Sequence, residues 1–200
     1  MENINVLKKE DIIEGLKKCG LKKGQNVLVH TSLKSFGFVI GGAETIIRSL
    51  LDTVGEEGTV MMPSQTWKNL DPEIGVHWEV PEKYYDAIRE NWPAYDKDVT
   101  PAIGMGVVSE LFAKWPGRKR SDHPARSFAA VGKNAQHLTE NHDLRNIFGE
   151  GSPLSKLYDL DGYVLLLGVY YNKNTSFHLA ETRANYKNKF ESTQHKLILQ

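Results

Sequence analysis

The chain has 200 residues, which suits a single domain with a sizeable buried core. Its 25 basic and 25 acidic residues balance, so no overall field indicates a nucleic acid or an anionic membrane as partner. A single cysteine, Cys19, excludes an internal disulfide framework, and the lack of a long apolar run gives no sign of a secretory leader or membrane span, so we expect a cytoplasmic protein.

The first part of the chain predicts a helix, a strand and a second helix. Asp11–Cys19 places apolar residues on one helical stripe that includes Cys19, and Asn26–His30 is typical of a buried strand. A long loop rich in hydroxyls and glycine, residues 31–42, leads into a helix over Ala43–Val54. Most loops between a strand and a helix are shorter, so this one either holds an anionic or extended ligand on its backbone N–H groups or is an ordinary connection.

A short strand, Thr59–Pro63, leads into the least regular part of the sequence, Ser64–Thr100. This segment carries eight acidic residues against four basic ones and three tryptophans, Trp67, Trp78 and Trp92, with no sustained period. Long irregular segments are often lids or binding loops, so we expect an acidic lid or insertion whose field attracts a polyamine. A solvated surface loop is the equally open alternative.

Thr100-Pro101 predicts the start of another helix, because proline is favoured in the first turn. Its glycine-rich opening, Ala102–Gly106, would let the backbone approach a ligand closely. The block 114–126 then reverses the charge, with five basic residues against one acidic residue. A neutral chain that separates its charges in this way either handles two oppositely charged ligands or contains a structural ion-pair network.

The remaining elements complete an alternation of strands and helices. We expect a strand at Ser127–Val131, a short helix over Asn134–His142, and a helix capped by Ser152 with Pro153 in its first position. Tyr163–Gly168 is apolar on both faces, which predicts a strand in the middle of the sheet. The alternation favours a single α/β domain, layered α/β/α, with a central mixed sheet.

The stretch after that strand carries the most chemically suggestive spacing. Thr175 and Ser176 are candidate caps for a helix in which His178 and Glu181 stand three residues apart and therefore share one face. A carboxylate that accepts one ring N–H of a histidine leaves the other nitrogen free to act as a general base. The competing interpretation places His178 in the core and Glu181 in water.

Seven sequence blocks in order resemble one enzyme family: VLVHTSLKSFGFVIGGAETIIRSLL, GTVMMPSQTW, TPAIGMGVVSELF, RSDHPARSFAAVG, FGEGSPLSKL, VLLLGV and TSFHLAE. The chain from about Val27 to about Glu181 is similar to the aminoglycoside 3-N-acetyltransferases, which modify antibiotics with acetyl-coenzyme A and lack the GNAT fold. The resemblance implies acetyl transfer to a cationic amine, an aminoglycoside 3-amino group, with acetyl-coenzyme A as co-substrate and no metal.

For this reaction we expect His178 to be the general base, Glu181 its orienting carboxylate and Thr175 a hydroxyl donor to the thioester oxygen. No cysteine stands near these motifs, so direct attack in a ternary complex is preferred over an acyl-enzyme. The resemblance implies further site residues. Three groups of residues would bind the coenzyme: Thr31, Ser32, Leu33, Lys34, Ser35 and Phe36; Ala102, Ile103, Gly104 and Met105; and Arg118, Ser121 and His123.

Two other functions are compatible with the same residues. Family members continue well past the last block, so we expect the C-terminal part of the domain to be missing or divergent. A relative that binds coenzyme A or an amine without turnover is therefore one alternative. A metal-dependent hydrolase using His30, His123, His178 and Glu181 is another. The sequence indicates neither the oligomeric state nor the order of strands.

Overall fold

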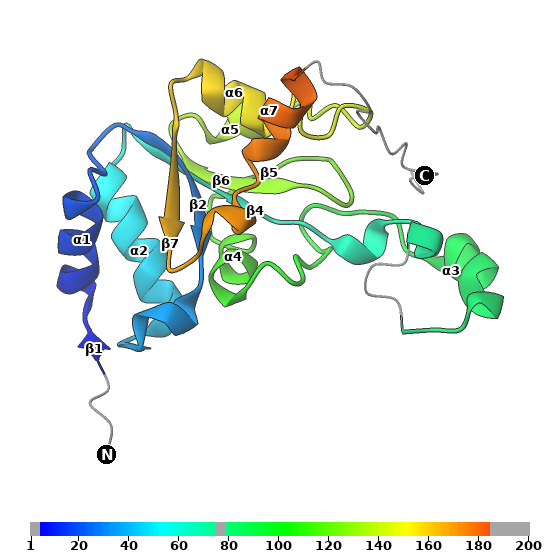
Figure 1. The fold of residues 1–200 in the computed structure, drawn as a ribbon, viewed down its shortest axis with the longest axis horizontal. Helices are drawn as coiled ribbons and strands as arrows, with labels where there is room; N and C mark the ends of the chain where they lie inside the picture. The colour runs from blue at the N-terminus through cyan, green and yellow to red at the C-terminus, as the bar shows by residue number, and fades with distance from the viewer. Residues whose placement is uncertain (1–4, 75–78, 185–200) are drawn as a thin grey trace.

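A mixed sheet forms the centre of the molecule in the computed structural model, which describes residues 5–74 and 79–184 (Figure 1). Its strands lie in the order β5-β6-β4-β2-β7. Their bounds are Asn26–Thr31 for β2, Thr59–Pro63 for β4, Lys119–Arg120 for β5, Phe128–Gly132 for β6 and Tyr163–Leu167 for β7. β2 runs parallel to β4 and β7, whereas β6 is antiparallel to β4 and β5, so the expected mixed sheet is confirmed.

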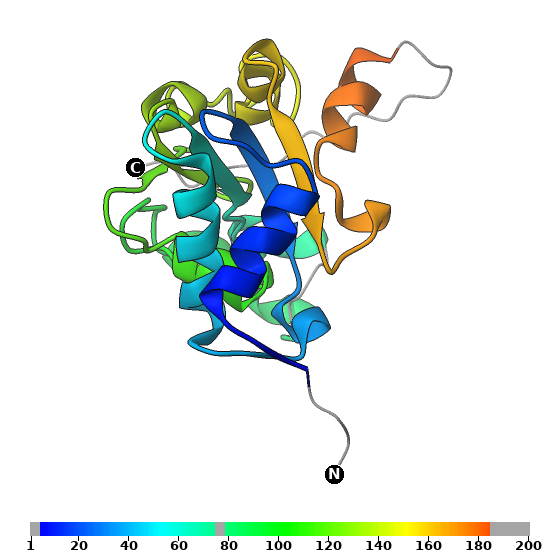
Figure 2. The same cartoon turned by 90° about the vertical axis from the view of Figure 1, so that its left-hand side faces the viewer.

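Helices cover both faces of this sheet, which confirms the layered α/β/α class. One layer contains α1 (Lys9–Lys18), α2 (Gly42–Val54) and α4 (Val107–Phe112). The other contains α5 (Ala135–Thr139), α6 (Pro153–Asp159) and α7 (Phe177–Arg183). Figures 1 and 2 show α5 and α6 on the opposite side of the sheet from α1 and α2. None of the helices in the described ranges is long and apolar enough to cross a membrane.

Alternating side chains of the strands supply two separate cores. Val27 and Val29 of β2 pack with the layer of α1, α2 and α4. Leu28 points to the other face, where it meets Met61, Phe128 and the apolar residues of α5, α6 and α7. Successive strand residues point to opposite faces, so a strand covered on both sides becomes a continuous apolar run in the sequence.

The position predicted for Tyr163–Gly168 is wrong. Among the described strands β7 lies at the edge of the sheet and pairs with β2 alone. Tyr163 and Val164 are 51% and 38% exposed. An apolar run cannot distinguish a central strand from one whose outer edge is open, because the number of neighbours in the sheet depends on long-range pairing.

The helix expected from Thr100-Pro101 begins later, at Val107. Gly104 and Gly106 adopt positive φ values of 85° and 87°, which interrupt a right-handed helix, and Ile103 instead forms an isolated parallel bridge to Thr66.

Smaller differences from the predicted structure occur near the N-terminus. β1 (Val6–Leu7) pairs in parallel with β3 (Phe38–Val39), and Cys19, expected to pack on the first helix, is exposed.

The described residues of the acidic segment 64–100 form the α-helix α3 (Tyr85–Asn91), which lies away from the sheet in Figure 1. Three short 3-10 helices precede it, at Trp67–Asn69, Pro72–Ile74 and Glu82–Tyr84. Trp78 falls outside the described residues. Two further 3-10 helices occur in the described part of the chain, at Leu33–Phe36 and Tyr171–Lys173.

Charged residues of the acidic segment pair with the basic block that follows it. Arg118 donates from Nη2 to Oδ1 of Asp98 at 2.8 Å, and Lys97 lies 3.1 Å from Oδ1 of Asp122. The Tyr95 hydroxyl also donates to the backbone oxygen of Ser121 at 2.9 Å. These contacts form ion pairs between the acidic segment and the basic block. A structural ion-pair network of this kind is one of the two interpretations of the charge separation in the sequence.

Candidate active site

The carboxyl ends of β2 and β7 lie side by side and bring two distant segments together. The parallel register pairs Thr31 with Leu167. Beyond it the backbone N–H of Ser32 donates to the Leu167 oxygen at 2.9 Å, and the Ser35 hydroxyl donates to the Gly168 oxygen at 2.7 Å. The hydroxyl-rich loop after β2 and the chain leading to α7 therefore start from the same edge of the sheet, where ligands collect in open α/β folds.

Gly168 is the residue that permits this close approach. Its φ is +67°, and a Cβ at this position would lie 2.5 Å from Cβ of Ser35. Both the backbone conformation and the space thus require glycine. The segment before α4 reaches the same region, since a Cβ at Gly106 would lie 3.9 Å from the Thr31 oxygen.

The residues before α7 fix where that helix begins. The prediction that the Thr175 or Ser176 side chain caps this helix is wrong, because Ser176 directly precedes α7 and its hydroxyl makes no capping hydrogen bond. Instead Oδ1 of Asn174 accepts from the Ser176 backbone N–H at 3.0 Å and from its hydroxyl at 2.6 Å. The backbone N–H of Thr175 donates to Nε2 of His30 at 3.3 Å. Burial lowers the pKa of His30 to about 4, so its ring is neutral and can accept this bond.

His178 and Glu181 form a hydrogen-bonded pair on α7. Nδ1 of His178 lies 2.7 Å from Oε2 of Glu181, and the two side chains are 49% and 59% exposed. An ionised carboxylate only accepts, so Nδ1 carries the proton of the neutral ring and Nε2 presents its lone pair. The half-exposed imidazole contradicts the competing interpretation of His178 as a core residue. The arrangement can accept a proton from a bound amine.

The remaining residues expected to bind the coenzyme divide into exposed and buried positions. Lys34, Ser35, Ile103 and Gly104 are exposed, which suits ligand contact. Thr31, Ser32, Leu33, Phe36 and Met105 are half-buried, and Ala102 is buried. Thr31 also keeps a buried hydroxyl oxygen without a hydrogen-bond partner among the described residues.

Arg118, Ser121 and His123 are engaged by the protein itself. The Arg118 guanidinium bonds Asp98 and also donates from Nε to the Ala113 oxygen at 2.8 Å. Ser121 is fully buried and its hydroxyl oxygen accepts from the Phe128 N–H at 3.0 Å. His123 is fully buried too, and burial lowers its pKa to about 3. A role of these three residues in coenzyme binding stays a prediction.

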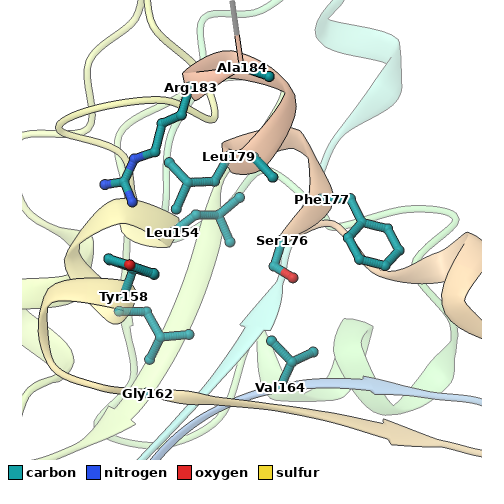
Figure 3. Close-up of a pocket in the computed structure, with 11 residues that line it drawn as sticks. Leu154, Tyr158, Gly162, Val164, Ser176, Phe177, Leu179, Arg183 and Ala184 are labelled. Carbon is teal, nitrogen blue, oxygen red and sulfur yellow. The ribbon is translucent and has the colours of Figure 1, made fainter.

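An apolar groove of about 600 Å³ lies on another side of α7, between that helix, α6 and β7 (Figure 3). Its walls come from these residues: Leu154, Leu157, Tyr158, Gly162, Val164, Ser176, Phe177, Leu179, Ala180, Arg183 and Ala184. His178 and Glu181 do not line it, so α7 separates the groove from the histidine–carboxylate pair. Within the described residues, no group of three or more His, Cys, Asp and Glu side chains could hold a metal ion.

A histidine–carboxylate pair beyond the carboxyl ends of parallel strands is an arrangement that can exchange a proton with a bound ligand, in an α/β domain of the class that collects ligands at this edge of the sheet. A comparison with known protein families identifies the family of this chain. Residues 28–200 match the family model described as aminoglycoside 3-N-acetyltransferase, and the chain belongs to this family.

Two curated relatives illustrate the match. The chain is 49% identical over 180 residues to the SPbeta prophage-derived aminoglycoside N(3')-acetyltransferase-like protein YokD of Bacillus subtilis, which covers 90% of this chain and 66% of the relative. It is 40% identical over 181 residues to aminoglycoside N(3)-acetyltransferase IX of Micromonospora chalcea, which covers 90% of this chain and 63% of the relative. The chain thus spans just under two thirds of the length of these relatives.

Solved structures share the fold. The crystal structure of YokD has 50% identity and a TM-score of 0.84, covering 89% of this chain and 71% of that one. A binary complex of AAC-IIIb with CoASH has 34% identity and a TM-score of 0.78, covering 90% and 66%. AAC-VIa bound to sisomicin has 30% identity and a TM-score of 0.79, covering 89% and 65%.

Proposed function

We propose that the chain transfers an acetyl group from acetyl-coenzyme A to an amino group of a cationic acceptor, an aminoglycoside 3-amino group, by direct attack in a ternary complex. The observation that carries the proposal is the 2.7 Å contact between Nδ1 of His178 and Oε2 of Glu181, on a half-exposed ring. Family membership supports the same reaction. AAC-IIIb binds CoASH and AAC-VIa binds sisomicin, which supports the two ligand classes.

The base is needed because an alkyl amine is mostly protonated at neutral pH and then has no lone pair to attack with. Nε2 of His178 accepts that proton, and Glu181 stabilises the imidazolium as it forms. The amine nitrogen attacks the thioester carbon and the carbon–sulfur bond breaks. The nitrogen gives its second proton to the departing sulfur, so coenzyme A leaves as the free thiol and the amide is neutral. General base catalysis of this kind contributes roughly 10²–10⁴ in rate.

Thr175 is the proposed donor to the thioester oxygen as it becomes negative. Its backbone N–H is engaged by His30, so the hydroxyl is the group proposed for this bond. The position, three residues before His178 in the turn that begins α7, supports the role. Loss of one such donor costs about 3–4 kcal/mol in transition-state stabilisation.

The coenzyme would lie along the loop Thr31–Phe36 and the segment Ala102–Met105. The exposed side chains of Lys34 and Ser35 and the approach of Gly106 to Thr31 support this placement. Arg118, Ser121 and His123 complete the proposed set. For Arg118 to meet a phosphate, its guanidinium must share or release Asp98. The carboxylates of the acidic segment are the proposed attraction for a polycationic acceptor.

Release of free thiol tests the proposal directly. The chain is mixed with acetyl-coenzyme A and a panel of amines that includes sisomicin, and the thiol is detected over time. A Cys19→Ser background removes the exposed free thiol of the protein from the assay. Amine-dependent release supports acetyl transfer. Binding of coenzyme A without release for any amine on the panel overturns it and leaves the binding-only alternative.

A further inference from the structure

Three consecutive residues in the loop between α5 and α6 contact α7. The ring of Phe148 stacks on the ring of His178, with centroids 4.8 Å apart and planes inclined by 20°. A Cβ at Gly149 would lie 2.6 Å from Cγ2 of Thr182, so the backbone approaches the helix closely there. Both oxygens of Glu150 accept from Arg183, at 2.6 Å to Nε and 3.1 Å to Nη2.

The core fixes the orientation of the Phe148 ring. Phe148 is half-buried against the cluster formed by β2, β4, β6 and helices α5–α7. It meets Phe128 of β6 edge to face, with centroids 6.4 Å apart at 86°, and Phe128 is fully buried. The imidazole therefore rests on a flat surface whose own position depends on a central strand of the sheet.

Two restraints are needed to orient a histidine ring, because its position is set by two side-chain dihedrals. The bond from Nδ1 to Glu181 fixes the direction of one ring edge but leaves rotation about that bond. A ring stacked on the imidazole face removes this rotation. Base catalysis depends on the direction of the Nε2 lone pair, and small misplacements of a reacting group can cost up to about 10²-fold in rate.

We propose that Phe148 is a positioning residue for His178, and that the contacts of Gly149 and Glu150 hold α7 against the same loop. This inference rests on the proposed role of His178 as the base. Phe148 touches neither the acceptor nor the coenzyme in this account. It acts by holding the imidazole in the plane that points Nε2 toward the acceptor.

The test compares variants that remove the ring with variants that keep it. Phe148→Leu and Phe148→Met delete the flat face and retain an apolar side chain, whereas Phe148→Tyr keeps the ring. Leu160→Ala is the matched control, because Leu160 is partly buried against the same core cluster. The readouts are kcat and KM for sisomicin from thiol release, and the NMR resonances of the His178 ring protons, assigned with His178→Gln. A stacked phenyl ring shields these protons.

We expect Phe148→Leu and Phe148→Met to lower kcat by roughly tenfold with little change in KM. In the same variants the His178 resonances should lose their upfield shift. Phe148→Tyr and Leu160→Ala should each keep kcat within about twofold of the value for the unsubstituted chain. An unchanged kcat and unchanged His178 resonances in either ring-deleting variant overturn the inference, as does an equal loss in Leu160→Ala. Failure of the proposed function is a different result, namely full turnover in His178→Ala, and the NMR shift still reports the stacking in that case.

Discussion

The backbone N–H of Thr175 donates to Nε2 of His30, so a strand in the centre of the fold holds the turn that begins α7. His30 lies on β2 and is 8% exposed, and its lowered pKa of about 4 keeps the ring neutral. The proposed oxyanion donor and the proposed base are three residues apart in one short turn. Their placement relative to the coenzyme loop therefore depends on this partly buried bond as well as on the pairing of β2 and β7.

Replacing His30 tests that dependence. His30→Leu keeps the approximate volume and removes the acceptor, which leaves the Thr175 N–H unpaired and costs about 1–3 kcal/mol of unfolding free energy. We also expect kcat to fall by about tenfold, because the turn before α7 loses its anchor. His30→Gln offers a side-chain oxygen in place of Nε2. Urea unfolding and thiol release should show a smaller loss for Gln, and equal losses in the two variants contradict the anchoring role.

Acid should destabilise the fold through three buried histidines. Burial lowers the pKa of His30 and His142 to about 4 and that of His123 to about 3, from an ordinary value of 6.5. Between these values the unfolded chain binds protons that the folded chain excludes, so stability is present above pH 6.5 and is lost as the pH falls toward 4. Each histidine contributes at most about 1.4 kcal/mol per pH unit.

Urea unfolding at pH 7.5, 6.0 and 5.0 measures this slope. His142→Gln should reduce the slope by about a third, since one of three similar titrations is removed. A free energy of unfolding that stays constant between pH 6.5 and 5.0 is incompatible with buried neutral histidines.

Gly168 should tolerate no side chain. In Gly168→Ala both the positive φ and the 2.5 Å approach to Cβ of Ser35 oppose the methyl group, so the loop after β2 must move away from β7. Gly117→Ala is the matched control, because its φ is +74° with no atom within 4 Å of the added Cβ. We expect about 1–2 kcal/mol of destabilisation for Gly117→Ala and at least twice that for Gly168→Ala, measured by urea unfolding. Similar losses of unfolding free energy in the two variants would show that Ser35 moves aside without strain.

Two substitutions can decide whether Arg118 binds the coenzyme or only pairs with Asp98. If its guanidinium binds a phosphate of the coenzyme, Arg118→Gln should raise KM for acetyl-coenzyme A by about tenfold or more and leave KM for the amine nearly unchanged. Asp98→Asn removes the competing partner and should not raise KM. If the contact with Asp98 is only a surface ion pair, both substitutions change stability by at most about 1 kcal/mol and leave KM alone.

The sequence was sufficient for features that depend on local periodicity. The apolar run Asn26–His30 predicted a buried strand and Thr59–Pro63 a short strand, and the structure has β2 and β4 at these positions, with side chains in both cores. The three-residue spacing of His178 and Glu181 predicted a shared helical face, where the two side chains are in hydrogen-bond contact. The cap at Ser152 with Pro153 following it is also present, since Oγ of Ser152 accepts from the Ser155 N–H at 3.4 Å.

Features that depend on contacts between distant segments could not be predicted. The outer edge of β7 is open among the described strands, although its sequence is as apolar as a central strand. The pair of Arg118 and Asp98 joins two segments with no shared pattern. No sequence pattern around Phe148 predicts its contact with His178, because this contact exists only once α7 has docked against the loop before α6.

The central claim is that His178, oriented by Glu181, removes the proton from the acceptor amine. The most direct measurement compares thiol release from acetyl-coenzyme A and sisomicin in the unchanged chain, His178→Ala and Glu181→Gln, alongside calorimetric binding of coenzyme A to each. We predict that His178→Ala lowers kcat by roughly 10²–10⁴ and that Glu181→Gln has a smaller effect, with coenzyme A affinity nearly unchanged in both. Amine-dependent thiol release at the unchanged rate in His178→Ala, or loss of coenzyme A binding together with turnover, contradicts the claim.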